Sequence, residues 1–220
     1  MEILLQLFGG RGGGSGGSRG GGAAKVPAGH PAISDIDYYG DVHVPIDQII
    51  ADGEAMGLSH ADAVAGANSI QYFTGGGYHS VHNGSDTKRN DDIDKWVEHP
   101  NAPIYTGTQY RGMTVSEDTA KAILNSGIYR DTGATSFSAS ESEAKSFASI
   151  SSSHNYGSWE DVHVLVTYAG GKRGMPIKHI SHFPWEDEVL HSRSDMQKGF
   201  KITGYKWAAG NHELYITVDD

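Results

Sequence analysis

The stretch HFPWEDEVLH (182–191) places three carboxylates in a row, directly before a Val-Leu step that is typical of a buried strand. If the chain is extended here, side chains alternate, so Glu186 and Glu188 face one side and Asp187 faces the other. Two carboxylates on one face, about 7 Å apart, can take separate roles on one substrate. A solvated acidic turn is the alternative interpretation.

A second candidate lies in YRGM (110–113), where Arg111 stands within a predicted strand and is followed by Gly112. Because glycine has no side chain, a ligand or another backbone can approach it closely. A buried arginine needs partners, and its planar fork suits a phosphate as well as a carboxylate. The pattern therefore indicates either an anion site or an internal ion pair.

Two serines form the third candidate. Ser136 and Ser138 alternate on a predicted strand in GATSFSA (133–139), so both hydroxyls point to one face. Hydroxyls one pleat apart can orient a carboxylate and a ligand. Serines at strand ends are common, so this pattern alone is not specific.

In this order, the three features resemble the signature of the ADP-ribosyltransferase superfamily of the clostridial-toxin type. That signature is an aromatic residue and Arg, then Ser-Thr-Ser, then Glu or Gln, any residue and Glu. The matching segments are YRG (110–112), SFS (136–138) followed by AKSFA (144–148), and EDEVL (186–190). Phe137 stands where the family has its middle threonine. The resemblance covers about residues 100–220.

The resemblance implies a role for each matched residue. Arg111 would grip the pyrophosphate or the adjoining ribose of NAD, and Ser136 would hold Glu188 by a hydrogen bond. Glu188 would bind the 2′-hydroxyl of the nicotinamide ribose and stabilise the oxocarbenium ion as nicotinamide leaves. Glu186 would orient or deprotonate the acceptor, and Glu at this position accompanies arginine acceptors in the family. Four further residues would complete the NAD site, without a metal ion: Tyr110, Gly112, Ser138 and Phe147.

Two loops would border this site. Phe183 and Trp185 would lie in the loop that meets the acceptor protein. Residues 151–161 would lie beside the nicotinamide, with Tyr156 or Trp159 as candidates for stacking on it.

Periodicity and capping residues predict an α+β fold and not a doubly wound parallel sheet. The resemblance implies two packed, mainly antiparallel sheets with flanking helices and an N-terminal helical region. Helices are expected at 44–57, 58–73, 91–99, 116–127 and 140–150, with Asp47, Ser59, Ser116 and Ser140 as N-caps, and 75–90 is expected to be a loop. Strands are expected at 104–113, 162–169, 175–183, 188–192, 200–209 and 212–219.

Composition divides the chain into a leader, 1–30, and one domain, 31–220, with a helical part (31–100) and a catalytic core (101–220). Residues 9–22 contain only Gly, Arg and Ser, which predicts a flexible tether behind the apolar tip MEILLQLF. The tip is interpreted either as a peptide that docks on a larger particle or as a remnant without a role. The leader resembles those of bacteriophage head-associated proteins, which implies the bacterial cytoplasm, or a virion that delivers the protein into it. It is a poor secretory signal.

The formal net charge of −10, from 17 basic and 27 acidic residues, argues against nucleic acid or an anionic membrane as the main partner. No segment approaches the roughly 18 apolar residues of a membrane span. Cysteine is absent, which excludes disulfides, thiolate metal sites and a cysteine nucleophile. The resemblance instead implies NAD and a protein acceptor as the partners.

Several rival interpretations stay open. Twelve histidines suggest a metal site, but on a strand the three-residue spacing of His179 and His182 points their side chains to opposite faces, which favours ordinary histidines. The other groupings are His191 with these two, and His79 with His82. A retaining glycosidase would explain the two glutamates but not Arg111 or SFS. An NAD glycohydrolase and an inactive structural or interaction module on a phage particle are the remaining alternatives.

Overall fold

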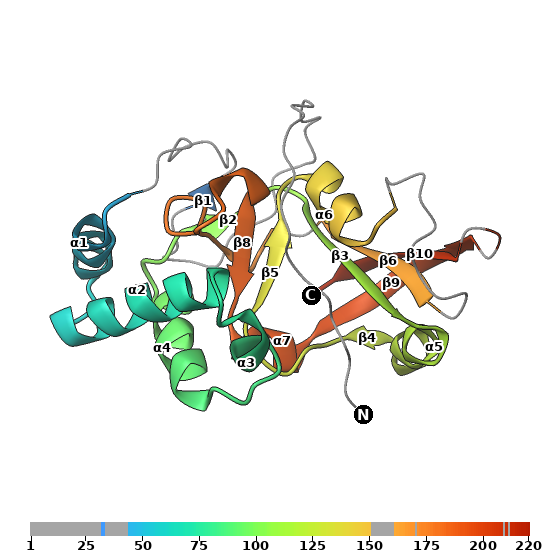
Figure 1. The fold of residues 1–220 in the computed structure, drawn as a ribbon, viewed down its shortest axis with the longest axis horizontal. Helices are drawn as coiled ribbons and strands as arrows, with labels where there is room; N and C mark the ends of the chain where they lie inside the picture. The colour runs from blue at the N-terminus through green and yellow to red at the C-terminus, as the bar shows by residue number, and fades with distance from the viewer. Residues whose placement is uncertain (1–31, 34–43, 151–160, 170, 209, 211) are drawn as a thin grey trace.

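The computed structural model describes residues 32–33, 44–150, 161–169, 171–208, 210 and 212–220 (Figure 1). The predicted α+β class is confirmed: helices α1 to α4 gather at one end, and a long sheet extends away from them (Figure 1). Three predictions lie outside the described residues, namely the apolar tip, the Gly-rich tether and the loop that carries Tyr156 and Trp159.

Eight strands form one sheet in the order β4-β9-β10-β6-β3-β5-β8-β7. Neighbouring strands are antiparallel, except that β6 and β10 are parallel. The strands are β3 (Gln109–Ser116), β4 (Ile128–Tyr129), β5 (Thr135–Ser138), β6 (Asp161–Tyr168), β7 (Met175–Pro176), β8 (Glu188–His191), β9 (Phe200–Ala208) and β10 (Glu213–Asp219). A separate parallel pair consists of β1 (Ala32–Ile33) and β2 (Ile104–Tyr105).

The sheet has a seam between β3 and β5. β3 pairs with β6 from Gln109 to Ser116, and all of β5 pairs with β8, whereas β3 and β5 pair only at Tyr110 and Ser138. The seam divides the strands into a five-stranded half and a three-stranded half. These halves correspond to the two expected sheets, and the single residue pair joins them.

The helices are α1 (Ile46–Met56), α2 (His60–Thr74), α3 (Tyr78–His82), α4 (Thr87–Val97), α5 (Glu117–Ser126), α6 (Glu141–Phe147) and α7 (Arg193–Lys198). Ser59, Ser116 and Ser140 are N-caps as predicted, since each side-chain oxygen accepts a bond from the N–H three residues later. Asp47 is not a cap: α1 begins after Pro45, and Asp47 lies in its first turn. The segment 75–90 is not all loop either, because it contains α3 and the start of α4.

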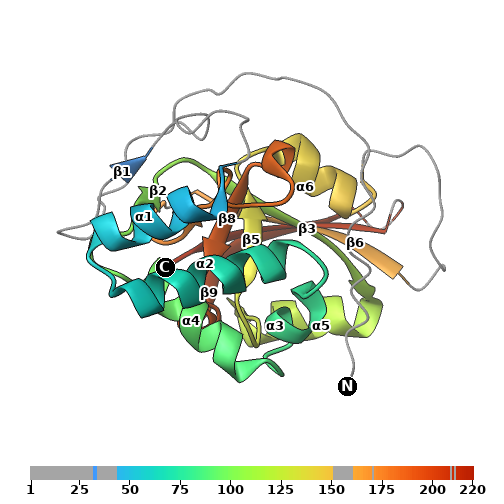
Figure 2. The same cartoon turned by 60° about the vertical axis from the view of Figure 1, so that its left-hand side comes forward.

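Two hydrophobic clusters form the core, one on each half of the sheet. The first cluster joins α1, α2 and α4, which lie together in Figure 2, to the three-stranded half, and it includes Ile49, Ile70, Phe73, Trp96, Ile177, Ile180 and Leu190. The second cluster fills the five-stranded half, and it includes Met113, Phe137, Val164, Tyr168, Phe200, Leu214 and Ile216. Phe137 crosses the seam, since it comes from β5 but packs in the second cluster.

Residues 175–183 do not form the predicted continuous strand. β7 ends at Pro176, and the carbonyl of Ile177 then accepts bonds from the N–H groups of Ile180 and Ser181 (2.8 and 2.9 Å). A 3-10 turn, η2 (Pro184–Glu186), follows. The N–H of Ile177 still donates to the carbonyl of Glu188 (3.0 Å), and the pairing ends there because the chain turns over 177–181.

The expected alternation of the three carboxylates is therefore wrong. Glu186 ends η2, Asp187 has a left-handed φ of 50°, and β8 begins only at Glu188. Glu186 and Glu188 thus reach one site from a turn and from a strand, and not from one strand face.

Gly112 is the point where α6 packs onto β3. A Cβ at this position would lie 1.6 Å from the carbonyl oxygen of Ala144 and 2.9 Å from the amide nitrogen of Ala148. Either a ligand or another backbone was expected to approach Gly112 closely, and the structure places the backbone of α6 there.

We expect Gly112→Ala to lower the free energy of unfolding by roughly 1–3 kcal/mol, because α6 must move away from β3 to admit the methyl group. Gly204→Ala in β9 is the matched control, since a Cβ there would meet nothing within 4 Å. Urea denaturation of both variants measures the difference. Equal stability of the two would contradict this account of Gly112.

Candidate active site

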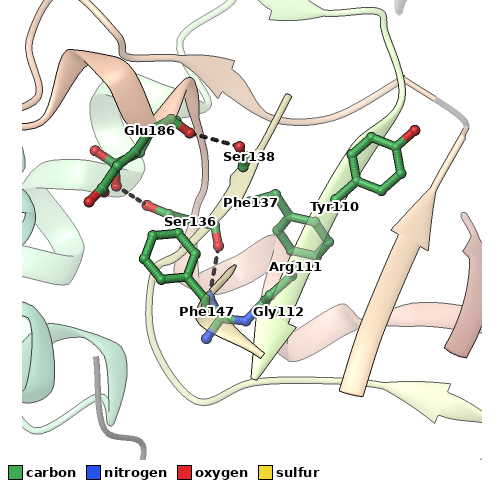
Figure 3. A pocket seen from close by; sticks show the side chains of 9 residues that line it. Tyr110, Arg111, Gly112, Ser136, Phe137, Ser138, Phe147 and Glu186 are labelled. Atoms are coloured by element: carbon green, nitrogen blue, oxygen red, sulfur yellow. Dashed lines mark hydrogen bonds between the residues drawn. The ribbon is translucent and has the colours of Figure 1, made fainter. Parts of the chain in front are cut away.

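An open pocket lies at the seam, with walls from β3, β5, α6, η2 and β8 (Figure 3). All eight residues predicted for the site line it, together with Phe137: they are Tyr110, Arg111, Gly112, Ser136, Ser138, Phe147, Glu186 and Glu188. Their roles stay predictions, but the fold brings three separate sequence motifs to one place.

Arg111 is 5% exposed, and its guanidinium crosses the seam. Nε donates to the phenolic oxygen of Tyr129 (2.9 Å), Nη1 to the backbone carbonyl of Ser136 (2.7 Å) and Nη2 to the phenolic oxygen of Tyr78 (3.0 Å). One side chain of β3 thus holds β4, β5 and α3. Because a guanidinium has five N–H donors, these bonds leave donors for an anion in the pocket.

Asp131 is the acidic residue beside the guanidinium of Arg111. Its Oδ2 lies 3.8 Å from Nη2 of Arg111 and 3.2 Å from Nε2 of His82. Burial raises the pKa of Asp131 to about 6, although the charge of Arg111 opposes the rise. Burial, followed by the charge of Arg111, lowers the pKa of His82 to about 3, so this ring is neutral at pH 7. Among Arg111, Asp131 and His82, Arg111 is therefore the positively charged residue.

The two pocket serines contact different partners (Figure 3). Ser136 Oγ donates to Oε1 of Glu188 (2.8 Å). Ser138 Oγ donates to the backbone carbonyl of Glu186 (2.7 Å) and accepts a bond from the N–H of Ser140 (2.9 Å). One serine therefore orients a carboxylate, and the other fixes the backbone of the turn that carries the second carboxylate.

The residue between the serines belongs to the core. The ring of Phe137 packs against Tyr129 and Phe200, with ring centroids 6.2 and 5.8 Å apart. Alternation along β5 sends this side chain away from the two hydroxyls. Phenylalanine in place of the family's threonine therefore leaves the serine contacts in position.

The two glutamates of the pocket have different environments. Burial raises the pKa of Glu188, and the hydroxyls of Ser181 and Ser136 lower it. Burial, and then the charges of Glu188 and Glu143, raise the pKa of Glu186 to about 9, so this carboxyl is protonated at neutral pH. Burial thus raises the pKa of both acids, but Glu188 has two hydroxyl partners that oppose the rise, whereas Glu186 has acidic neighbours that add to it.

Neither a model of a protein family nor a curated protein matches the sequence. Solved structures do match it in fold. The Vis toxin of Vibrio splendidus, an ADP-ribosyltransferase, aligns with a TM-score of 0.54 at 18% identity, over 79% of this chain and 81% of that one. The ADP-ribosyltransferase HopU1 of Pseudomonas syringae has a TM-score of 0.50 at 16% identity, over 81% and 88%. Exoenzyme S of Pseudomonas aeruginosa, bound to carba-NAD and in complex with human 14-3-3 protein beta, has 0.50 at 15%, over 79% and 86%.

The chain has the ADP-ribosyltransferase fold. The pocket of this fold also depends on residues that the sequence analysis missed. Tyr78 and Tyr129 bind Arg111, and Ser181 donates to Oε2 of Glu188. A buried lysine, Lys178, pairs with Asp187 at 2.9 Å, and this ion pair closes the turn. Tyr78 lies within a predicted loop, where the sequence carries no signal of such a contact, whereas Lys178 and Ser181 precede the acidic triplet closely enough to suggest a contact with it.

The predicted histidine groupings do not form a metal site within the described residues. His82 contacts Asp131 and the hydroxyl of Thr135, and His191 bonds to Oε1 of Gln109 (2.7 Å). None of the helices in the described part of the chain is long and apolar enough to cross a membrane.

Glu186 makes the stability of this fold depend on pH. Because its pKa of about 9 in the folded protein lies above its ordinary value of 4.5, folding favours the protonated form. The free energy of unfolding should therefore fall as the pH rises between these two values, by at most about 1.4 kcal/mol per pH unit.

Glu186→Gln removes this titration, so the variant should become steadily more stable than the wild type from about pH 5 to about pH 9. Urea denaturation at several pH values measures the gap. Asn68→Ala, which replaces an exposed side chain of α2 that does not titrate, is the control and should keep a constant gap. A constant gap for Glu186→Gln as well would overturn the assignment of a raised pKa.

Proposed function

We propose that the protein is an NAD-dependent mono-ADP-ribosyltransferase that modifies protein side chains, with arginine as the acceptor. The observation that carries the proposal is the position of Glu188, a buried carboxylate that Ser136 fixes in a pocket also lined by Arg111. The reaction needs a negative charge beside the ribose and a cation for the phosphates of NAD. The fold of the chain and the order of its three motifs agree with this reading.

In the proposed reaction, the bond between the ribose and the nicotinamide nitrogen breaks, and a bond from the ribose to the acceptor forms. Arg111 binds the pyrophosphate or the adjoining ribose with the donors that its internal bonds leave. Glu188 accepts a bond from the 2′-hydroxyl and stabilises the oxocarbenium ion, because a fixed charge in a site with little water acts strongly on a developing opposite charge. The remaining pocket wall, which contacts NAD, consists of Tyr110, Gly112, Ser138 and Phe147.

Glu186 is proposed to orient the acceptor and take its proton. A carboxyl with a pKa of about 9 is a stronger base, once ionised, than an exposed glutamate. Vis toxin has been crystallised with agmatine, whose guanidinium is the same reactive group as that of an arginine side chain. Trp185, which is 53% exposed and contacts Phe183, offers the acceptor protein a flat surface beside Glu186.

The first test incubates the protein with labelled NAD and either a bacterial lysate or agmatine. The wild type should label proteins or agmatine, and Glu188→Gln should lower the rate by at least about 10²-fold, because the charge beside the ribose is lost. Asp92→Asn is the matched control, since Asp92 is a buried carboxylate that accepts a serine hydroxyl from Ser69 in the helical region. Equal labelling by the wild type and Glu188→Gln would sink the proposal.

Three further measurements distinguish the alternative functions. Nicotinamide release without any labelled acceptor would identify an NAD glycohydrolase. Sugar release from glycosides without NAD would identify a glycosidase. A wild type that does not bind NAD would support an inactive module on a phage particle.

The second test separates the roles of the two glutamates. Glu186→Ala should lose transfer to agmatine but keep NAD hydrolysis, because the charge that stabilises the ribose cation is still present. In the wild type, transfer should increase relative to hydrolysis as the pH approaches about 9, where Glu186 becomes ionised. Nicotinamide release and labelled agmatine are quantified in parallel. If hydrolysis disappears in Glu186→Ala as completely as in Glu188→Gln, the division of roles is wrong.

A further inference from the structure

Ser181 is a second serine that holds the carboxylate of Glu188. It lies in the turn between β7 and η2, and none of its surface is exposed. We propose that Ser181 is a positioning residue that fixes Glu188 as an anion and ties its orientation to the turn that carries Glu186. This inference rests on the proposed function in so far as Glu188 acts on NAD, but the contact itself can be tested without any substrate.

The hydrogen bonds of Ser181 give its hydroxyl a single direction. Its Oγ accepts a bond from the backbone N–H of Phe183 (3.0 Å) and donates its proton to Oε2 of Glu188. Ser136 donates to the other oxygen, Oε1, at 2.8 Å. Both carboxylate oxygens therefore accept a hydroxyl proton. An ionised carboxylate suits two such donors, whereas a protonated carboxyl would bring a proton of its own to one of them.

Several bonds hold the turn against the start of β8. The N–H of Ile177 donates to the carbonyl of Glu188 (3.0 Å), and the N–H of Ser181 donates to the carbonyl of Ile177 (2.9 Å). Lys178 and Asp187 form an ion pair at 2.9 Å across the ends of the turn. Ser181 therefore has little freedom to leave Glu188, and the carboxylate is fixed between β5 and the turn.

Hydroxyl donors suit the task proposed for Glu188. Within the described residues, no Lys or Arg forms an ion pair with this carboxylate, and its recorded side-chain bonds come from two serines. A cation at this position would cancel the negative charge that a ribose cation needs. Neutral hydroxyls orient the carboxylate and favour its ionised form against the effect of burial, while its net charge stays available.

The test compares Ser181→Ala with Ser69→Ala, which removes another buried serine hydroxyl that donates to a carboxylate, that of Asp92, in the helical region. Carboxyl-selective ¹³C NMR titration of the protein without NAD reports the pKa of Glu188, whose signal is the one missing in Glu188→Gln. Because a lost bond to a charged group favours the neutral form, Ser181→Ala should raise this pKa by about one unit or more. Ser69→Ala should leave it unchanged.

The rate of NAD cleavage provides the second readout. The reaction requires ionised Glu188, so its rate falls as the pH drops through the pKa of this group. Ser181→Ala should therefore move the acid limb of kcat to higher pH by the same shift and lower kcat by about ten-fold on that limb, with a smaller change in KM for NAD. Ser181→Cys, which keeps a side chain of similar size with a weaker donor, should show a shift in the same direction.

The outcomes separate the inference from the proposed function. If the wild type does not cleave NAD, the function fails, but the NMR titration still decides whether Ser181 fixes Glu188. An unchanged pKa of Glu188 in folded Ser181→Ala, or in Ser181→Cys where the alanine variant does not fold, would overturn the inference. An equal shift in Ser69→Ala would also overturn it, because the effect would then come from a general loss of stability.

Discussion

The bonds that the Arg111 guanidinium makes across the seam are the constraint on which the pocket depends. Neighbouring strands normally continue their backbone ladder, but β3 and β5 pair only at Tyr110 and Ser138. Beyond that pair, the carbonyl of Ser136 accepts a bond from the Arg111 side chain. The two strands can therefore diverge without leaving this carbonyl buried and unpaired, which would be costly. The pocket lies where this backbone pairing ends, and Arg111, which bonds the two strands there, is also the cation that lines it.

Two glutamates of this pocket show how the environment divides one kind of side chain into two chemical roles. Glu188 lies at the start of a strand, where two hydroxyls favour the carboxylate. Burial, followed by the charges of Glu188 and Glu143, raises the pKa of the Glu186 carboxyl to about 9. The left-handed residue Asp187 turns the chain between them. Two acids held by such different partners can act as an anionic stabiliser and a proton carrier in one site.

The residues of the site could be predicted from the sequence more completely than the fold around them. The eight pocket residues were predictable because three short motifs match a known signature in their order and spacing, and N-caps such as Ser116 were predictable because capping is local. The turn at 177–187 was not predictable from period-two alternation, since it depends on the ion pair of Lys178 with Asp187. Nor was the contact of Tyr78 with Arg111, because the two residues lie far apart in sequence and meet only once α3 packs at the seam.

The helical region is part of the framework of the site, although none of the eight predicted site residues lies in it. α3 gives Tyr78 to Arg111, and the hydroxyl of Thr74 at the end of α2 accepts a bond from the N–H of His182 in the turn (3.2 Å). The first cluster also contains Ile177 and Ile180, so the same helices pack against the turn that carries Glu186. The same layer of helices therefore contacts both Arg111 and the turn that carries Glu186. Because close-packed interiors transmit displacement, a shift of α2 or α3 would move the cation and the acids of the pocket relative to each other, and this makes residues 44–97 a determinant of the site geometry.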